Sequence, residues 1–99
     1  MARFDVFPNR HGPGYLLDCQ ADILATLNTR FVVPLLLPDE APIAGRRLNP
    51  SFEIEGATVI MYTQFAAAVQ RGDLASPSAS LADEDVTIMN ALDMLLTGC

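Results

Sequence analysis

Short segments with the character of β-strands fill the first four-fifths of this chain of 99 residues, and this pattern constrains its fold most. Residues 3–7 alternate polar and apolar side chains and stop at Pro8, and residues 15–19 predict a returning strand after a loop rich in Gly and Pro. Residues 30–37 are the most apolar strand, in which Pro34 lacks a backbone donor and predicts an edge position or a break. Residues 52–55 and 57–62 predict a hairpin that turns at Gly56.

The segments between these strands are less regular. Residues 38–50 carry three prolines and a glycine and predict a connection, whereas residues 21–27 fit either a helical turn or an exposed loop. Residues 65–69 fit one more short strand, residues 71–73 a turn, and residues 75–79 a linker. The chain therefore has about five or six predicted strands before residue 80.

The segment after residue 80 predicts a helix that begins at Ser80 as its N-cap and ends at Gly98. Three apolar residues at helical spacing predict its buried face: Ile88, Leu92 and Leu95. Three polar residues predict a separate face: Asn90, Asp93 and Thr97. Strands followed by one helix predict an α+β fold in which residues 1–99 form a single domain, a small antiparallel β-barrel with a C-terminal α-helix.

Composition limits the function. The formal net charge is −6, with 12 acidic and 6 basic residues, so most of the surface repels nucleic acid and we expect no direct binding to it. The hydrophobic fraction is 51% in a chain too short to bury it all, which predicts a homodimer. The beginning of the chain carries an acid where a signal peptide is apolar, and no segment approaches the ~20 apolar residues of a membrane span, so we expect a cytosolic protein. Cys19 and Cys99 form no paired ligand motif, and we expect neither a metal nor a cofactor.

Four stretches carry a resemblance to a known family. They are residues 17–24 (LDCQADIL), 29–35 (TRFVVPL) and 48–50 (LNP), and the helix at residues 88–98. With these motifs in the same order, the chain resembles the CcdB family, the toxin half of a type II toxin–antitoxin system. The resemblance implies an SH3-like barrel of the CcdB and MazF kind with a C-terminal helix, a homodimer, and a non-enzymatic toxin that binds the A subunit of DNA gyrase. It also implies a cognate antitoxin with a disordered C-terminal segment.

The resemblance assigns residues to these contacts. It places gyrase contacts at Ile23 and Leu24 and on the last helix, at the following residues: Asp93, Leu96, Thr97, Gly98 and Cys99. Thr97 stands where the family has a tryptophan. A non-toxic homologue with a lost or shifted target is therefore an alternative, because a buried Trp is a typical interface anchor. Antitoxin binding is implied near the first hairpin loop, where Asn9, Arg10 and His11 are the candidates.

A second alternative is a MazF-like endoribonuclease, because the two families share the barrel. Such an enzyme needs an acid, a base and cations at the scissile phosphate. Four residues are the candidate suppliers: Arg10, His11, Arg30 and Arg46. The negative net charge counts against an RNA groove, so we predict no catalytic residues.

Overall fold

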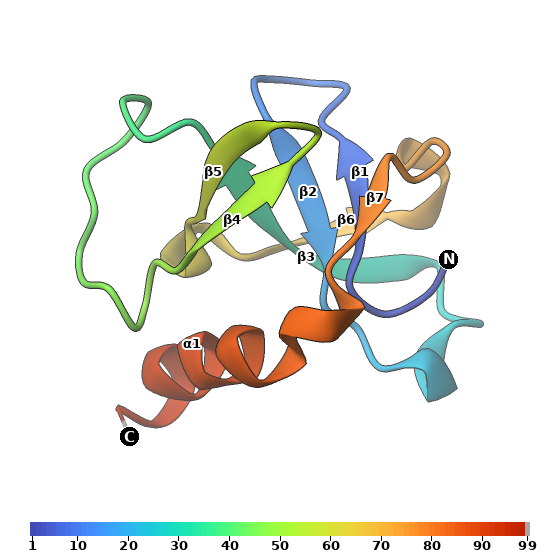
Figure 1. The fold of residues 1–99 in the computed structure, drawn as a ribbon. Helices are drawn as coiled ribbons and strands as arrows, with labels where there is room; N and C mark the ends of the chain where they lie inside the picture. The colour runs from blue at the N-terminus through green and yellow to red at the C-terminus, as the bar shows by residue number, and fades with distance from the viewer. Residues whose placement is uncertain (99) are drawn as a thin grey trace.

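The structure is a computed structural model that describes residues 1–98, and these residues form seven strands and one α-helix (Figure 1). The strands are β1 (Asp5–Pro8), β2 (Tyr15–Asp18), β3 (Thr29–Leu36), β4 (Ser51–Ile54), β5 (Ala57–Met61), β6 (Ala67–Gln70) and β7 (Ala79–Ser80). The helix is α1 (Asp85–Thr97), and four 3₁₀ turns are η1 (Asp22–Leu24), η2 (Thr63–Phe65), η3 (Arg71–Asp73) and η4 (Ala82–Glu84).

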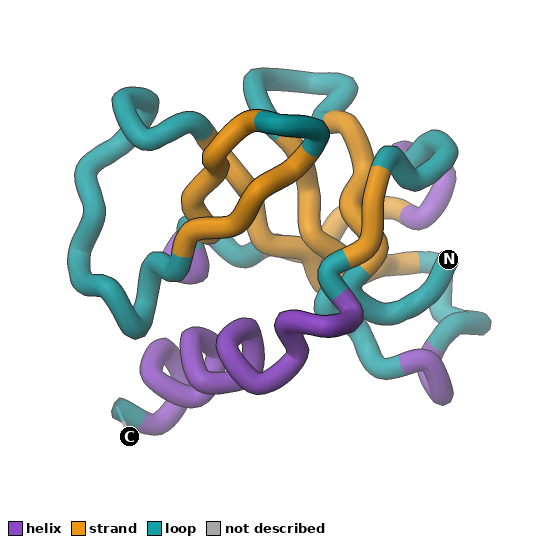
Figure 2. Tube along the Cα trace, in the orientation of Figure 1, coloured by secondary structure: helices purple, strands orange, loops and turns teal. Residues whose placement is uncertain are grey.

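The strands form one antiparallel sheet that curls into a nearly closed barrel. Its order is β4-β5-β3-β2-β1-β7, and β6 pairs with β3 outside this path. Helix α1 lies beneath one end of the barrel, while the β1–β2 loop lies at the opposite end (Figures 1 and 2). The fold is therefore the predicted α+β class, a small antiparallel barrel with a C-terminal helix.

The main core lies between the barrel and the helix. Inward side chains of the strands pack there, among them Val6, Leu17, Val33 and Leu35, and α1 contributes Ile88, Ala91 and Leu92. The helix was correctly predicted, but the expectation that Leu95 is buried is wrong, since 39% of it is exposed. All buried residues of α1 lie at or before Leu92, because its last turn extends past the core.

The start of the helix also differs from the prediction. Ser80 lies in β7, opposite Asp5, and α1 begins five residues later at Asp85. The Ser80 hydroxyl accepts a hydrogen bond from the Ala82 N–H (3.2 Å), so it caps the 3₁₀ turn that precedes the helix rather than the helix itself. The predicted end at Gly98 is confirmed: this residue is left-handed (φ 74°) and its N–H donates to the Met94 carbonyl.

Pro34 lies in a central strand, so its predicted edge position is wrong. The first half of β3 pairs with β6, and its end, Leu35 and Leu36, pairs with β5. Pro34 sits between these two ladders, and its carbonyl accepts a hydrogen bond from the Tyr62 N–H (3.0 Å). The missing donor is tolerated there because the strand changes partner at that residue.

Three further boundaries differ from the prediction. The first strand begins at Asp5 because Phe4 has a left-handed backbone (φ 71°), and it extends through Pro8, which pairs with Tyr15. The expected strand at residues 65–69 divides into η2 and β6, and the expected linker at 75–79 ends in β7. None of the helices in residues 1–98 is long and apolar enough to cross a membrane.

Candidate functional site

The loop of residues 21–28 presents apolar side chains to solvent. Ile23 and Leu24 lie in η1 and are 89% and 46% exposed, and Leu27 on the same loop is 46% exposed. The ambiguous segment of the sequence is therefore a 3₁₀ turn at the surface rather than core packing. Three large apolar residues in five positions form an exposed patch of the kind that marks interaction surfaces.

Hydrogen bonds of the Gln20 side chain anchor this loop to the barrel. The Gln20 Nε2 donates to the carbonyls of Leu24 (3.1 Å), within the loop, and Thr29 (3.0 Å), directly after it. Its Oε1 accepts from the Phe31 N–H (3.0 Å) in β3. One side chain thus fastens the middle and the end of the loop to β3, and a partner would meet a surface that is already ordered.

A second tether comes from the N-terminal segment. Asp22 Oδ1 accepts a hydrogen bond from the Arg3 N–H (2.8 Å). The Arg3 guanidinium lies 4.6 Å from the centre of the Phe4 ring and its Nη2 contacts the Met89 sulfur of α1 at 3.0 Å. The loop, the N-terminal segment and the helix are therefore connected through Arg3.

A buried ion pair supports the same region. Asp18 and Arg30 are both fully buried, and Asp18 Oδ2 accepts hydrogen bonds from Arg30 Nε (3.0 Å) and Nη2 (2.6 Å). Asp18 Oδ1 accepts from the Gln20 N–H (3.1 Å). The acidic and amide residues of the LDCQADIL motif therefore build the support of the loop, while Ile23 and Leu24 are its exposed part.

The thiol of Cys19, within the same motif, has low reactivity. Burial raises the pKa of Cys19 to about 12, and the charge of Asp18 adds to the effect. Because the thiolate is the reactive form, this cysteine stays a neutral core residue at ordinary pH.

The other half of the implied gyrase surface lies at the end of α1. Asp93, Leu96, Thr97 and Gly98 are exposed there, and 73% of Leu96 is accessible. The Thr97 hydroxyl donates to the Asp93 carbonyl (2.8 Å), while Cys99 lies outside the described residues. In Figure 1 the helix ends far from η1, so one chain does not bring the two halves together.

The implied antitoxin residues lie on the β1–β2 loop, at the opposite end of the barrel from α1. The loop is closed by the Asn9 N–H, which donates to the Gly14 carbonyl (3.1 Å). Asn9 Oδ1 accepts from the His11 N–H (3.1 Å). Arg10 and His11 are exposed, so two basic side chains project from an ordered turn.

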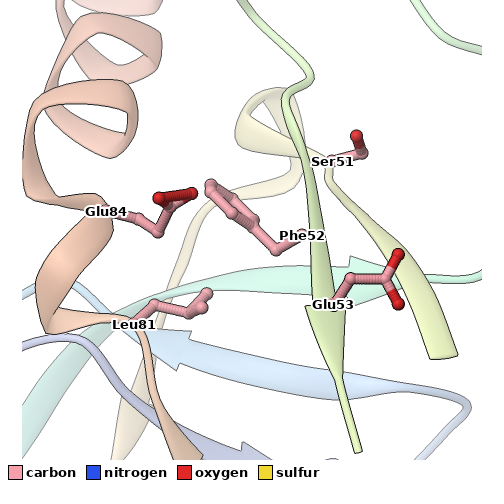
Figure 3. Close-up of a pocket in the computed structure, with 5 residues that line it drawn as sticks. All are labelled: Ser51, Phe52, Glu53, Leu81 and Glu84. Carbon is pink, nitrogen blue, oxygen red and sulfur yellow. The ribbon is translucent and has the colours of Figure 1, made fainter. Parts of the chain in front are cut away.

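Two cavities flank the β4–β5 hairpin. One, of about 430 Å³, lies where the barrel is open, and Figure 3 shows Phe52 of β4 and Glu84 of η4 projecting toward one another across it. Its other lining residues are Ser51, Glu53 and Leu81, so it offers carboxylates but no cation. The second, of about 520 Å³, is lined partly by Arg46 and Asn49.

The cations considered for a ribonuclease do not share one environment. Arg30 is enclosed with Asp18, whereas Arg10 and His11 occupy the β1–β2 loop and Arg46 the connection after β3. Among residues 1–98, no three His, Cys, Asp or Glu side chains gather closely enough to hold a metal ion.

The barrel has a counterpart among solved structures. It is similar to an endoribonuclease solved in complex with its cognate antitoxin, from a mycobacterial species, with a TM-score of 0.78 and 12% sequence identity over 97% of this chain and 94% of that one. At such low identity the likeness shows the fold alone. A search of curated proteins found no match.

The sequence places the chain more narrowly. The family model described as CcdB protein matches residues 3–98. The chain therefore belongs to the CcdB family of toxins from toxin–antitoxin systems, as its motifs indicated.

Two features of the site were missed by sequence reasoning. Leu27 joins the exposed patch, and its position three residues after Leu24 was the available signal. The tethering role of Gln20 had no such signal, because its three partners are backbone groups brought together only by the fold.

Proposed function

We propose that this protein is a toxin that acts in the cytosol by binding the A subunit of DNA gyrase and trapping its cleavage complex, without catalysis of its own. The observation that carries the proposal is the exposure of Ile23, at 89%, on a loop that Gln20 fastens to the barrel. An isolated apolar residue at a surface needs no explanation, but Ile23, Leu24 and Leu27 together form a patch. Family membership supports gyrase as the partner.

The end of α1 supplies the remainder of the proposed contact. Asp93, Leu96 and Thr97 are exposed, and Gly98 and Cys99 continue the chain beyond them. Thr97 lacks the aromatic anchor of the family, so we expect weaker binding than a tryptophan gives. Replacement Thr97→Trp should strengthen gyrase binding, and an unchanged affinity would favour a shifted target.

We further propose that the active form is a homodimer. Besides Leu96, large apolar side chains of α1 remain exposed in the single chain, namely Val86 (69%), Met94 (40%) and Leu95 (39%). Packing these side chains against a second copy of the chain would remove apolar area from water. Sedimentation at micromolar concentration should give about twice 10.7 kDa, and a clean monomer would contradict this.

The antitoxin is proposed to contact the β1–β2 loop through Asn9, Arg10 and His11. The two basic side chains are exposed on a chain of net charge −6, so they form a local site for an acidic segment. Antitoxin affinity should fall with salt and with Arg10→Glu. Equal affinity of Arg10→Glu and the unaltered protein would remove this loop from the interface.

A ribonuclease is the second candidate, and the similarity of the fold to an endoribonuclease is the observation that favours it. Against it stand the enclosure of Arg30 and the separate loops of the other cations. A mixed RNA panel should stay intact in the presence of the protein. Cleavage that disappears in Arg10→Ala or His11→Ala would replace the gyrase proposal.

The test of the gyrase proposal begins in cells. Expression of the protein alone should arrest growth, and expression with its cognate antitoxin should not. Purified protein added to gyrase and plasmid DNA should then accumulate cleaved DNA. Growth arrest without cleaved DNA would mean a toxin with another target.

A further inference from the structure

A third cavity, of about 460 Å³, lies between the 21–28 loop and η3. It is lined by Met1, Ala25, Arg30, Arg71 and Gly72, which include two arginines and no carboxylate. An adjoining hollow of about 380 Å³ shares Arg71 and Gly72 with it. In a chain with a net charge of −6, this is a local concentration of cationic side chains.

One of the residues that line the cavity, Arg30, has a buried hydrogen-bond donor without a partner. Arg30 is fully buried. Its Nε and Nη2 donate hydrogen bonds to Asp18, but its Nη1 has no hydrogen-bond partner. Buried polar atoms are almost always paired, and an exception calls for a ligand or an ordered water. The Asp18 carboxylate accepts from Arg30 Nε and Nη2 and from the Gln20 N–H, and it makes no hydrogen bond with Arg30 Nη1.

The wall of the cavity supplies a second guanidinium. Arg71 Nη1 donates to the Ala25 carbonyl (2.9 Å), and its backbone N–H donates to the Asn28 carbonyl (2.8 Å). The backbone is therefore held, while the exposed side chain is attached by one hydrogen bond and can turn. Because Arg30 is fully buried, an anion reaches it only if side chains that line the cavity, Arg71 among them, move aside.

We propose that this cavity binds a phosphate-sized oxyanion between the guanidinium groups of Arg30 and Arg71. A tetrahedral oxyanion can accept from both groups at once, and arginine is the preferred residue for such charge-assisted hydrogen bonds. The Arg30 charge is balanced by Asp18, so Arg71 provides the net attraction and Arg30 Nη1 provides direction.

Nitrogen-15 NMR with inorganic phosphate tests this proposal. Phosphate should shift the Arg30 guanidinium signals and the Gly72 amide saturably, while sodium chloride at the same ionic strength should not. Acetate should bind more weakly, because it carries less negative charge and fewer acceptor oxygens than phosphate. Acetate binding as tight as phosphate would overturn the assignment.

Two variants complete the test. Arg71→Gln should weaken phosphate binding about tenfold through loss of a charged partner. Arg46→Gln removes the same charge from an exposed position on the connection after β3, outside the lining of the cavity, and should leave the affinity unchanged. The proposal is wrong if phosphate shifts nothing beyond the chloride response, or if the two variants lose affinity equally. The readout is independent of gyrase, so failure of either proposal can be recognised without the other.

Discussion

Gln20→Ala should loosen the apolar loop and lower the free energy of unfolding by about 2–3 kcal/mol. Three hydrogen bonds of this side chain are lost. Water can replace it at the exposed carbonyls of Leu24 and Thr29, at roughly 0.5 kcal/mol each. The Phe31 N–H loses its acceptor, and because this donor is only partly buried the loss costs about 1–2 kcal/mol, the lower part of the range for an unsatisfied donor. For a domain of this size the sum lowers the melting temperature by about 10–15 °C.

Thermal and urea unfolding measure this loss, and hydrogen exchange locates it. The amides of Leu24 and Leu27, which close the turns of the loop, should exchange faster in Gln20→Ala. Gln70→Ala is the matched control, because Gln70 is an exposed glutamine in β6 and its loss should stay within about 0.5 kcal/mol. Equal small losses in the two variants, with unchanged exchange in the loop, would refute the tethering role.

Three further predictions concern the barrel. Asp18→Ala leaves the buried charge of Arg30 unpaired and should cost about 3–5 kcal/mol in urea unfolding; a loss under about 1 kcal/mol would contradict the buried pair. Cys19 should resist iodoacetamide at pH 8 in the native protein and react in the unfolded protein, as measured by peptide mass spectrometry. Because the pKa of Cys19 is raised in the folded state, its contribution to the free energy of unfolding is complete below the ordinary pKa of 9.0 and is lost as the pH rises toward about 12. Gly14→Ala should lower the free energy of unfolding by about 2–4 kcal/mol, because Gly14 has φ +76° and a Cβ there would overlap the Leu35 carbonyl oxygen. Gly12→Ala is the control in thermal unfolding, and a smaller loss for Gly14→Ala than for Gly12→Ala would contradict this prediction.

Local sequence patterns predicted most helices and strands of this fold, but not which elements pack or pair with one another. Sequence patterns placed the first six strands within two residues but missed β7, and helical spacing found α1. Pro34 was predicted to lie at an edge or a break because the rule considers one strand alone, whereas β3 is a central strand that changes neighbours at that residue. Leu95 was placed in the core because its spacing is correct, although the helix has by then passed the barrel.

The candidate site shows the same division. The exposure of Ile23 and Leu24 followed from the family resemblance, since an Ile-Leu pair in a sequence fits a core equally well. The support beneath them depends on backbone groups from β3 and the loop, which no side-chain pattern reveals. The unpartnered Arg30 Nη1 is likewise a property of the fold, because in the sequence Arg30 is one of six basic residues.

The most direct test compares two isoleucines in a gyrase cleavage assay. Ile23 and Ile43 are both exposed, at 89% and 52%, but Ile43 lies on the connection after β3 and belongs to neither part of the proposed contact. The unaltered protein should accumulate cleaved DNA with gyrase. Ile23→Asp should weaken this by about thirtyfold or more, as expected for loss of an interface anchor worth about 2 kcal/mol, and Ile43→Asp should match the unaltered protein. No cleaved DNA with the unaltered protein, or equal activity of the two variants, would contradict the account.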